Sequence, residues 1–128
     1  MSDPTSFYVG WLVDPGDREA LLARIAPSYP LVVAHHVTFK FGDRGAALPT
    51  ETSGEIVGEA DDGLGVQALV VRIGGTTARP DGGTYHITWS LADGREARES
   101  NAVIGERGWT EIPSPVRVGL HPQGFERA

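Results

Sequence analysis

The chain has 128 residues, of which 40% are hydrophobic and 22% charged, and its formal net charge is −6 at pH 7. This length and composition predict one globular domain, residues 1–128, that can bury a sizeable core. The acidic excess argues against an extended nucleic-acid surface, because such surfaces use lysine and arginine to neutralise phosphates. The absence of cysteine excludes disulfides and thiolate metal sites. No apolar run is long enough to span a membrane and the N-terminus lacks a secretory pattern, so we expect a cytoplasmic protein. We also expect a monomer.

The order of apolar and turn-forming residues predicts an α+β fold built on antiparallel sheet with two short helices. Asp14 and Pro15 are typical of a helix N-cap followed by proline at the first helical position, and Pro27 should end that helix. Asp61, Asp62 and Gly63 form a hairpin-type turn signal. The predicted strands are residues 7–13, 31–41, 54–60, 66–73, 84–91 and 116–120. A second helix is expected over about 95–106, and the loops 42–54 and 74–83 connect these elements.

Two of the predicted strands repeat one design. Side chains alternate between the faces of a strand, so residues two apart lie on the same side. In 31–41, His36 and Thr38 share a face, and the apolar residues and His35 share the other. In 84–91 (TYHITWSL), His86 and Thr88 oppose an aromatic and aliphatic face. We therefore expect a concave surface that carries two imidazoles and two hydroxyl groups.

This combination suits proton transfer at a phosphate. Imidazole titrates near neutral pH, so two facing histidines can act as general base and general acid. Threonine hydroxyls on the same face can donate hydrogen bonds to phosphate oxygens, and the charge that develops needs stabilisation. Lys40 lies on that face by strand parity and is a candidate phosphate contact, although a solvated charge at a strand end is the simpler interpretation. The chemistry requires neither a metal nor another cofactor.

The segments HHVTF and YHITWS resemble the paired His-x-Thr/Ser motifs of the two-histidine (2H) phosphoesterase superfamily. The wider segments AHHVTFKFG and YHITWSLADGREARESNAVI are most similar to its small RNA-repair-like branch, which includes cyclic phosphodiesterase domains associated with tRNA ligases. The resemblance runs from the first strand through Ile104. It implies a compact bilobal fold whose pseudo-symmetric antiparallel sheets flank a central cleft, with the two helices outside. The chain is shorter than many members of the superfamily, so the resemblance does not settle the choice of substrate.

The resemblance also implies metal-independent hydrolysis of a 2′,3′-cyclic phosphate, or a related phosphodiester, of a nucleotide or RNA end. His86 is provisionally the base that activates water, and His36 the acid that protonates the departing ribose oxygen. Thr38 and Thr88 would hold the phosphate oxygens. The two histidine roles exchange if the other P–O bond breaks, and the sequence leaves that open.

Weaker candidates lie around these motifs. Tyr8 and Trp11 are possible stacking partners for a nucleobase, although aromatic residues in strands usually belong to the core. Ser100, with Asn101, stands where the RNA-repair-like branch often has a similar Ser-Asn pair, and a structural or N-cap role is an equal alternative. His35 is expected to be buried and to donate to the backbone. The glycine-rich loop 74–83 lacks the ending of a phosphate-binding P-loop, so we interpret it as a mobile connection near the site.

Three other functions remain open at this stage. The same site would suit a hydrolase of cyclic nucleotide or oligonucleotide signals, and a substrate panel separates that activity from RNA-end repair. A non-catalytic module would bind nucleotide or phosphate without turnover. A metallohydrolase would combine His36 and His86 with a carboxylate, but no ligand spacing in the sequence supports it.

Overall fold

The computed structural model describes residues 7–42 and 45–126. Its helices and strands, in chain order, are β1 (Phe7–Val13), α1 (Pro15–Arg24), β2 (Leu31–Val32), β3 (His36–Phe41), β4 (Ser53–Asp61), β5 (Val66–Arg72), β6 (His86–Leu91), α2 (Glu99–Arg107) and β7 (Thr110–Glu126). The predicted α+β class with antiparallel strands and two short helices is confirmed. No described helix has the length and apolar character needed to cross a bilayer.

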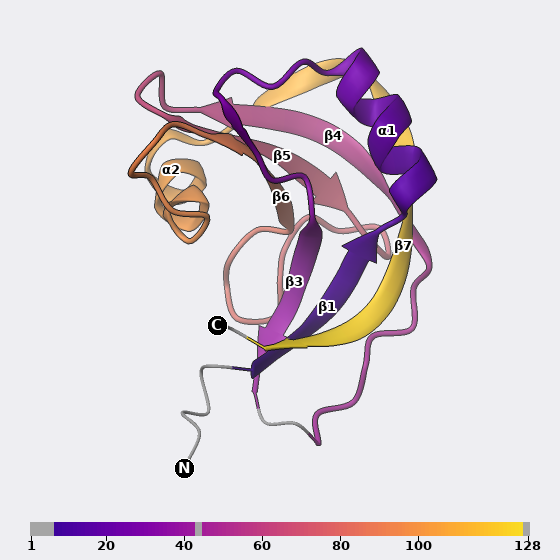
Figure 1. Ribbon diagram of the computed structural model, residues 1–128. Coiled ribbons are helices and arrows are strands. Elements are labelled where there is room, and N and C mark those ends of the chain that lie inside the picture. The colour runs from indigo at the N-terminus through magenta and orange to yellow at the C-terminus, as the bar shows by residue number, and fades with distance from the viewer. Residues whose placement is uncertain (1–6, 43–44, 127–128) are drawn as a thin grey trace.

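The strands form one closed antiparallel barrel rather than separate pseudo-symmetric sheets. The strand order is β2-β6-β3-β1-β7-β4-β5, and a further pairing between β6 and β5 closes six of the strands into a ring. The bilobal expectation is corrected here because β7 is far longer than the predicted 116–120. Its 17 residues pair with β4 through its first half and with β1 through its second, so this strand joins the two halves (Figure 1).

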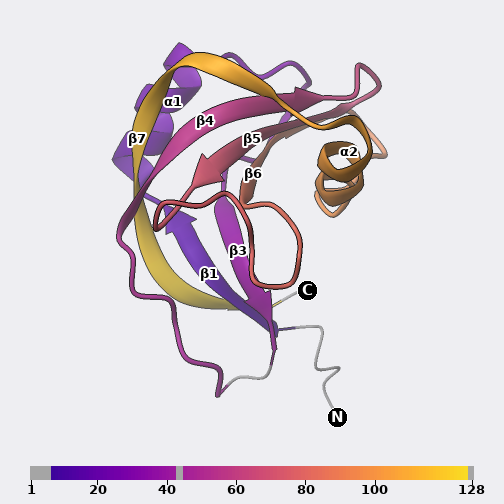
Figure 2. The ribbon, with the colours of Figure 1, turned by 180° about the vertical axis from the view of Figure 1, so that it is seen from behind.

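Two apolar clusters hold the fold together on opposite faces of the strands. The first is the barrel interior, where Trp11, Val37, Ile87 and Trp89 are fully buried and α1 contributes Leu21. The second cluster lies between α2 and strands β4, β5 and β6, and includes Val103 and Ile104 of the helix. The two helices therefore sit on different sides of the barrel (Figures 1 and 2). Burial of these side chains is the main stabilising contribution to both contacts.

Local signals in the first third of the chain act as predicted. β1 spans the predicted residues, and α1 begins at Pro15 with Asp14 as N-cap, whose carboxylate accepts a 3.1 Å hydrogen bond from the Asp17 backbone N–H. That contact satisfies one of the amide groups left unpaired in the first helical turn.

The prediction of one strand over 31–41 is wrong in a single respect. The strand is interrupted after Val32 and resumes at His36, because Ala34 adopts a positive φ of 45°.

Candidate active site

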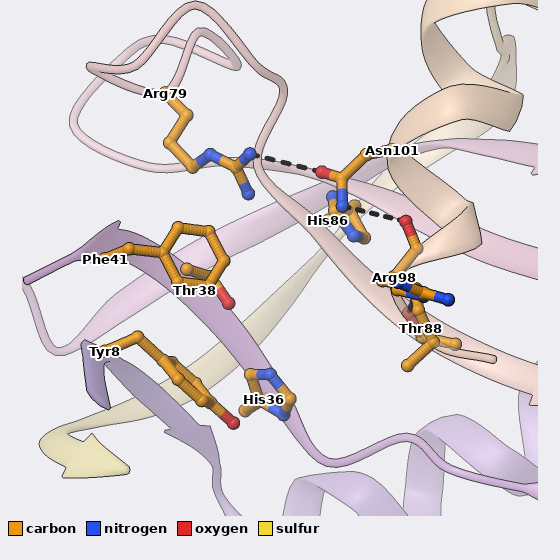
Figure 3. A pocket seen from close by; sticks show the side chains of 10 residues that line it. Tyr8, His36, Thr38, Phe41, Arg79, His86, Thr88, Arg98 and Asn101 are labelled. Carbon is orange, nitrogen blue, oxygen red and sulfur yellow. Dashed lines mark hydrogen bonds between the residues drawn. The ribbon is translucent and has the colours of Figure 1, made fainter. Parts of the chain in front are cut away.

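The two His-x-Thr segments lie side by side on β3 and β6. Val37 and Ile87 are partners in the antiparallel pairing of these strands. By the same register, Thr38 lies across from His86 and His36 lies across from Thr88. The pairing is limited to this one position, so the strands diverge beyond it. The four side chains therefore face a shared opening on the outer face of the barrel, as strand parity predicted (Figure 3).

A pocket of about 130 Å³ occupies this opening. It receives side chains from β1, β3 and β6, from the loop before β6, and from α2 with the residues just before it (Figure 3). Its lining residues are Tyr8, His36, Thr38, Phe41, Arg79, His86, Thr88, Ala97, Arg98 and Asn101. Sequence reasoning had not selected Phe41, Arg79 or Arg98. The available signal for Arg79 was a cation inside a glycine-rich loop that leads directly into the second histidine strand.

His86 is held as a neutral base with a defined tautomer. Its Nδ1 lies 2.8 Å from the carbonyl oxygen of Thr84. Because a carbonyl only accepts, Nδ1 carries the proton and Nε2 keeps its lone pair. Burial lowers the pKa of His86, the Thr84 hydrogen bond opposes this effect, and the nearby Arg79 cation adds to it. The ring is therefore ready to accept a proton through Nε2.

His36 is also neutral at pH 7, for a related reason. Burial lowers its pKa from 6.5 to about 4, and repulsion from His35 and His86 acts in the same direction. The ring packs among aromatic groups, with its centroid 5.3 Å from that of Tyr8 and 5.2 Å from that of Phe125. This apolar packing disfavours the imidazolium form because it removes water from around the charge.

His35 does not occupy the buried position that was expected for it. The side chain is exposed, and its Nδ1 lies 3.1 Å from Nδ1 of His36. In a regular strand these adjacent side chains would point to opposite faces. His35 lies in the break before β3, which follows Ala34 with its positive φ, so strand alternation does not apply to it and its ring contacts that of His36.

The two threonines differ in how free their hydroxyl groups are. Thr88 is buried and its hydroxyl donates to the carbonyl oxygen of Ala97 at 3.2 Å, while Oγ of Ser100 lies 2.8 Å away. Thr38 makes no side-chain hydrogen bond within the described part of the chain and can donate into the pocket. Ser100 is fully buried behind Thr88 and does not line the pocket, so its contact with a ligand would be indirect.

Arg79 places a positive charge over the histidines. Its side chain is only 7% exposed. The guanidinium Nε donates to Asp81 at 2.8 Å, and one terminal nitrogen donates to the Asn101 side-chain oxygen at 3.1 Å. The second terminal nitrogen has no hydrogen-bond partner in the described chain and remains for a ligand (Figure 3). Gly83 permits this arrangement, because a Cβ there would lie 2.6 Å from the guanidinium.

The glycine-rich loop 74–83 that carries Arg79 is built like a hairpin. Backbone hydrogen bonds run from Arg79 to Gly83 and from Gly82 to Arg79, both at 3.0 Å, and from Tyr85 to Thr77 at 2.8 Å. The loop lies near the site, as its interpretation as a mobile connection implied, and these hydrogen bonds shape the turn that presents the Arg79 cation to the pocket.

A bulge in β3 decides the position of one weaker candidate, Lys40. Val9 and Gly10 of β1 are consecutive, but their partners on β3 are Lys40 and Thr38, so Phe39 is an extra residue. An inserted residue shifts the alternation of side chains by one. Phe41 consequently lines the pocket, while Lys40 is exposed and does not.

The two aromatic candidates of β1 also separate. Tyr8 lines the pocket, as proposed for a base-stacking residue, and its ring stacks on Phe125 with centroids 5.0 Å apart. Trp11 points instead into the barrel, fully buried, with its Nε1 donating to the Glu51 carbonyl oxygen at 2.9 Å. Trp11 is therefore a core residue.

Comparisons with known proteins leave the family open. No family model, curated protein or solved structure gave a significant match to the chain. Within residues 7–42 and 45–126, no three histidine, aspartate or glutamate side chains gather in a way that could hold a metal ion. The function must therefore be inferred from the chemistry of the pocket.

Proposed function

We propose that the protein is a phosphoesterase of the two-histidine type that hydrolyses a 2′,3′-cyclic phosphate, or a related phosphodiester, of a nucleotide or RNA end without a metal. The observation that carries the proposal is the convergence of His36, His86 and Arg79 on one small pocket. Two imidazoles supply proton transfer, and a guanidinium recognises anionic phosphate oxygens. The small pocket suits a phosphate group with its ribose, and the nucleobase would lie near Tyr8 and Phe41.

Hydrolysis follows from the tautomer of His86. Its Nε2 takes a proton from water as the hydroxide oxygen bonds to phosphorus. The bond from phosphorus to one ribose oxygen breaks, and that oxygen receives a proton from Nε2 of His36. A cyclic phosphodiester and water thus become a phosphomonoester. Thr38 and Arg79 donate to the non-bridging oxygens, where negative charge accumulates in the transition state.

The low pKa of His36 is compatible with this acid role when substrate is bound. An anionic phosphate within a few ångströms favours the imidazolium form and raises the pKa of the ring. His86, which accepts the proton of water, is already neutral in the empty pocket. Binding of the anion therefore produces the pair of protonation states that acid–base catalysis needs.

The test is incubation with 2′,3′-cyclic nucleotides, cyclic dinucleotides and ADP-ribose cyclic phosphate in the presence of a chelator, followed by phosphorus NMR. We expect a phosphomonoester from at least one 2′,3′-cyclic substrate. Replacement of His86 or His36 by alanine should reduce turnover by about 10²–10⁴-fold, the usual loss for a proton-transfer group. His121→Ala serves as control, because His121 is exposed and contacts Asp14 outside the pocket.

Each result of this experiment has a defined meaning. Full activity of His86→Ala would refute the two-histidine mechanism, and loss of activity with chelator would refute metal independence. Binding of the nucleotides without turnover would identify a non-catalytic module. Turnover restricted to cyclic dinucleotides would indicate a hydrolase of cyclic oligonucleotide signals.

A further inference from the structure

The pair formed by His35 and His36 is unusual in its backbone as well as its side chains. Consecutive residues of a strand point to opposite faces, yet these two rings approach to 3.1 Å between their Nδ1 atoms. His35 lies in the break between β2 and β3, and Ala34, directly before the pair, is the one described residue other than glycine with a positive φ. Residues with side chains rarely adopt this conformation, and such strain concentrates at functional sites.

The surroundings of Ala34 maintain this conformation. The residue is fully buried, and its backbone N–H donates to the carbonyl oxygen of Thr88 at 2.9 Å. Its own carbonyl accepts a 2.9 Å hydrogen bond from Nε of Arg18 on α1. The turn is thus anchored to the second histidine strand on one side and to a helix on the other, which makes it a built feature of the site.

Contact between two Nδ1 atoms constrains the tautomers, because a hydrogen bond needs one donor and one acceptor. If Nδ1–H of His35 donates, Nδ1 of His36 accepts and the proton of His36 resides on Nε2. Nε2 is then the nitrogen of His36 that can donate to a leaving oxygen. His35 itself is exposed and exchanges protons directly with water.

We propose that His35 is a positioning residue and proton relay for His36. The role rests on the proposed function. His35 Nδ1–H holds His36 in the Nε2–H tautomer. When the bound phosphate favours the imidazolium form of His36, the proton on Nδ1 of His35 passes to Nδ1 of His36, and Nε2 of His36 then gives its proton to the ribose oxygen. Nε2 of His35 takes a proton from solvent in the same step, so this ring stays neutral. After turnover His86 releases to solvent the proton it took from water, Nε2 of His36 takes one up, and the proton on Nδ1 of His36 returns to Nδ1 of His35 as Nε2 of His35 gives its own to solvent.

The groups around His36 explain why a relay is useful. Burial, His35 and His86 all lower its pKa, so these surroundings do not give His36 a charge of its own at pH 7. Besides His35, the titratable, charged or aromatic groups that face it or line the same pocket are Tyr8 of β1, Phe41 of β3, His86 of β6, Phe125 of β7, and Arg79 and Arg98. None of these is a carboxylate that would stabilise an imidazolium. An exposed neighbour that carries the proton removes this obstacle.

The first test reads the tautomers by two-bond ¹H–¹⁵N NMR of the full chain at neutral pH, which needs no substrate. We expect protonated Nε2 and unprotonated Nδ1 for His36 in the wild type. His35→Phe, which keeps an aromatic ring, and His35→Ala should both change this pattern to a mixture. Protonated Nδ1 of His36 in the wild type, or an unchanged pattern in both variants, would overturn the proposal.

The second test measures turnover of a 2′,3′-cyclic nucleotide. His35→Phe should lower kcat by roughly 10–100-fold with KM within about twofold, as for loss of an assisting proton transfer. Added imidazole buffer should restore part of kcat, and His121→Phe should match the wild type. Unchanged kcat in His35→Phe, or loss without rescue by imidazole, would refute the relay. If the wild type hydrolyses no cyclic phosphate, the proposed function fails, while the NMR pattern still decides whether His35 orients His36.

Discussion

Replacement of His36 by glutamine should remove a defined part of the pH dependence of stability. The pKa of His36 is about 4 in the folded chain and about 6.5 as an unperturbed group. Between these values the unfolded chain binds a proton that the folded chain excludes, so the free energy of unfolding falls as pH falls. The contribution is complete above about pH 6.5 and is lost as pH drops towards 4.

The size of this effect follows from the pKa difference. The difference 6.5 − 4 is 2.5 pKa units, and one unit corresponds to about 1.4 kcal/mol, so the full loss is about 3.5 kcal/mol. Carboxylates that titrate in the same range affect wild type and His36→Gln equally. The difference in unfolding free energy between the two proteins therefore isolates the histidine.

The assay is urea unfolding of wild type and His36→Gln at several pH values from neutral to about pH 4.5. We expect the stability of the wild type relative to the variant to decline by about 2–3 kcal/mol over this range. Lys40→Gln is the matched control, since it removes an exposed charge from the same strand, and it should run parallel to the wild type. A difference between wild type and His36→Gln that stays constant within about 0.5 kcal/mol would show that His36 is not desolvated in the folded state.

Three further predictions concern the frame of the pocket. Arg79→Gln should raise KM for a 2′,3′-cyclic nucleotide by about tenfold or more, because a charge-assisted hydrogen bond to phosphate is lost. Lys40→Gln should leave KM unchanged. Equal effects of the two substitutions on KM would refute the role of Arg79. Ser100→Ala should lower the free energy of unfolding in urea by about 1 kcal/mol, since the buried hydroxyl of Thr88 loses a partner. An unchanged midpoint of urea unfolding would contradict this. Gly10→Ala should destabilise the chain by about 1–3 kcal/mol or more, because a Cβ there would lie 2.1 Å from the carbonyl oxygen of Val37. A melting temperature equal to that of the wild type would disprove the close approach of β1 and β3.

Short-range patterns determined much of the scaffold in advance. The alternation in residues 7–13 and the Asp14–Pro15 signal located β1 and the start of α1, because strand amphipathicity and helix capping depend on neighbours in the chain. The hairpin turn after Ala60 also follows from its own residues, as Asp62 accepts hydrogen bonds from the backbone N–H groups of Leu64 and Val66.

The end of the chain shows where such patterns lose information. β7 begins six residues before the predicted 116–120 and ends six residues after it. Pro113 and Pro115 break the usual strand signal, since proline cannot donate to a ladder. They are tolerated because pairing with β4 is interrupted there, between the partners Glu111–Gly58 and Val116–Ile56. Closure of the barrel depends on this strand and was therefore not visible in the sequence.

The candidate site divides in the same way. Strand parity was sufficient to place His36 with Thr38 and His86 with Thr88, because a period of two is a local property of each strand. The bulge at Phe39 depends on the register between β3 and β1. Because of it, Phe41 lines the pocket and Lys40, which strand parity placed there, does not.

Tertiary structure alone supplied the groups that complete the pocket. Arg79 reaches it through hydrogen bonds to Asp81 and to Asn101, 22 residues further along the chain. His35 contacts His36 in the break before β3, where hydrogen bonds with Arg18 and Thr88 hold the backbone of Ala34. The sequence by itself determined which two strands carry the imidazoles. Packing between distant segments decided which charges and hydrogen bonds surround them, because those contacts exist only once the barrel has closed.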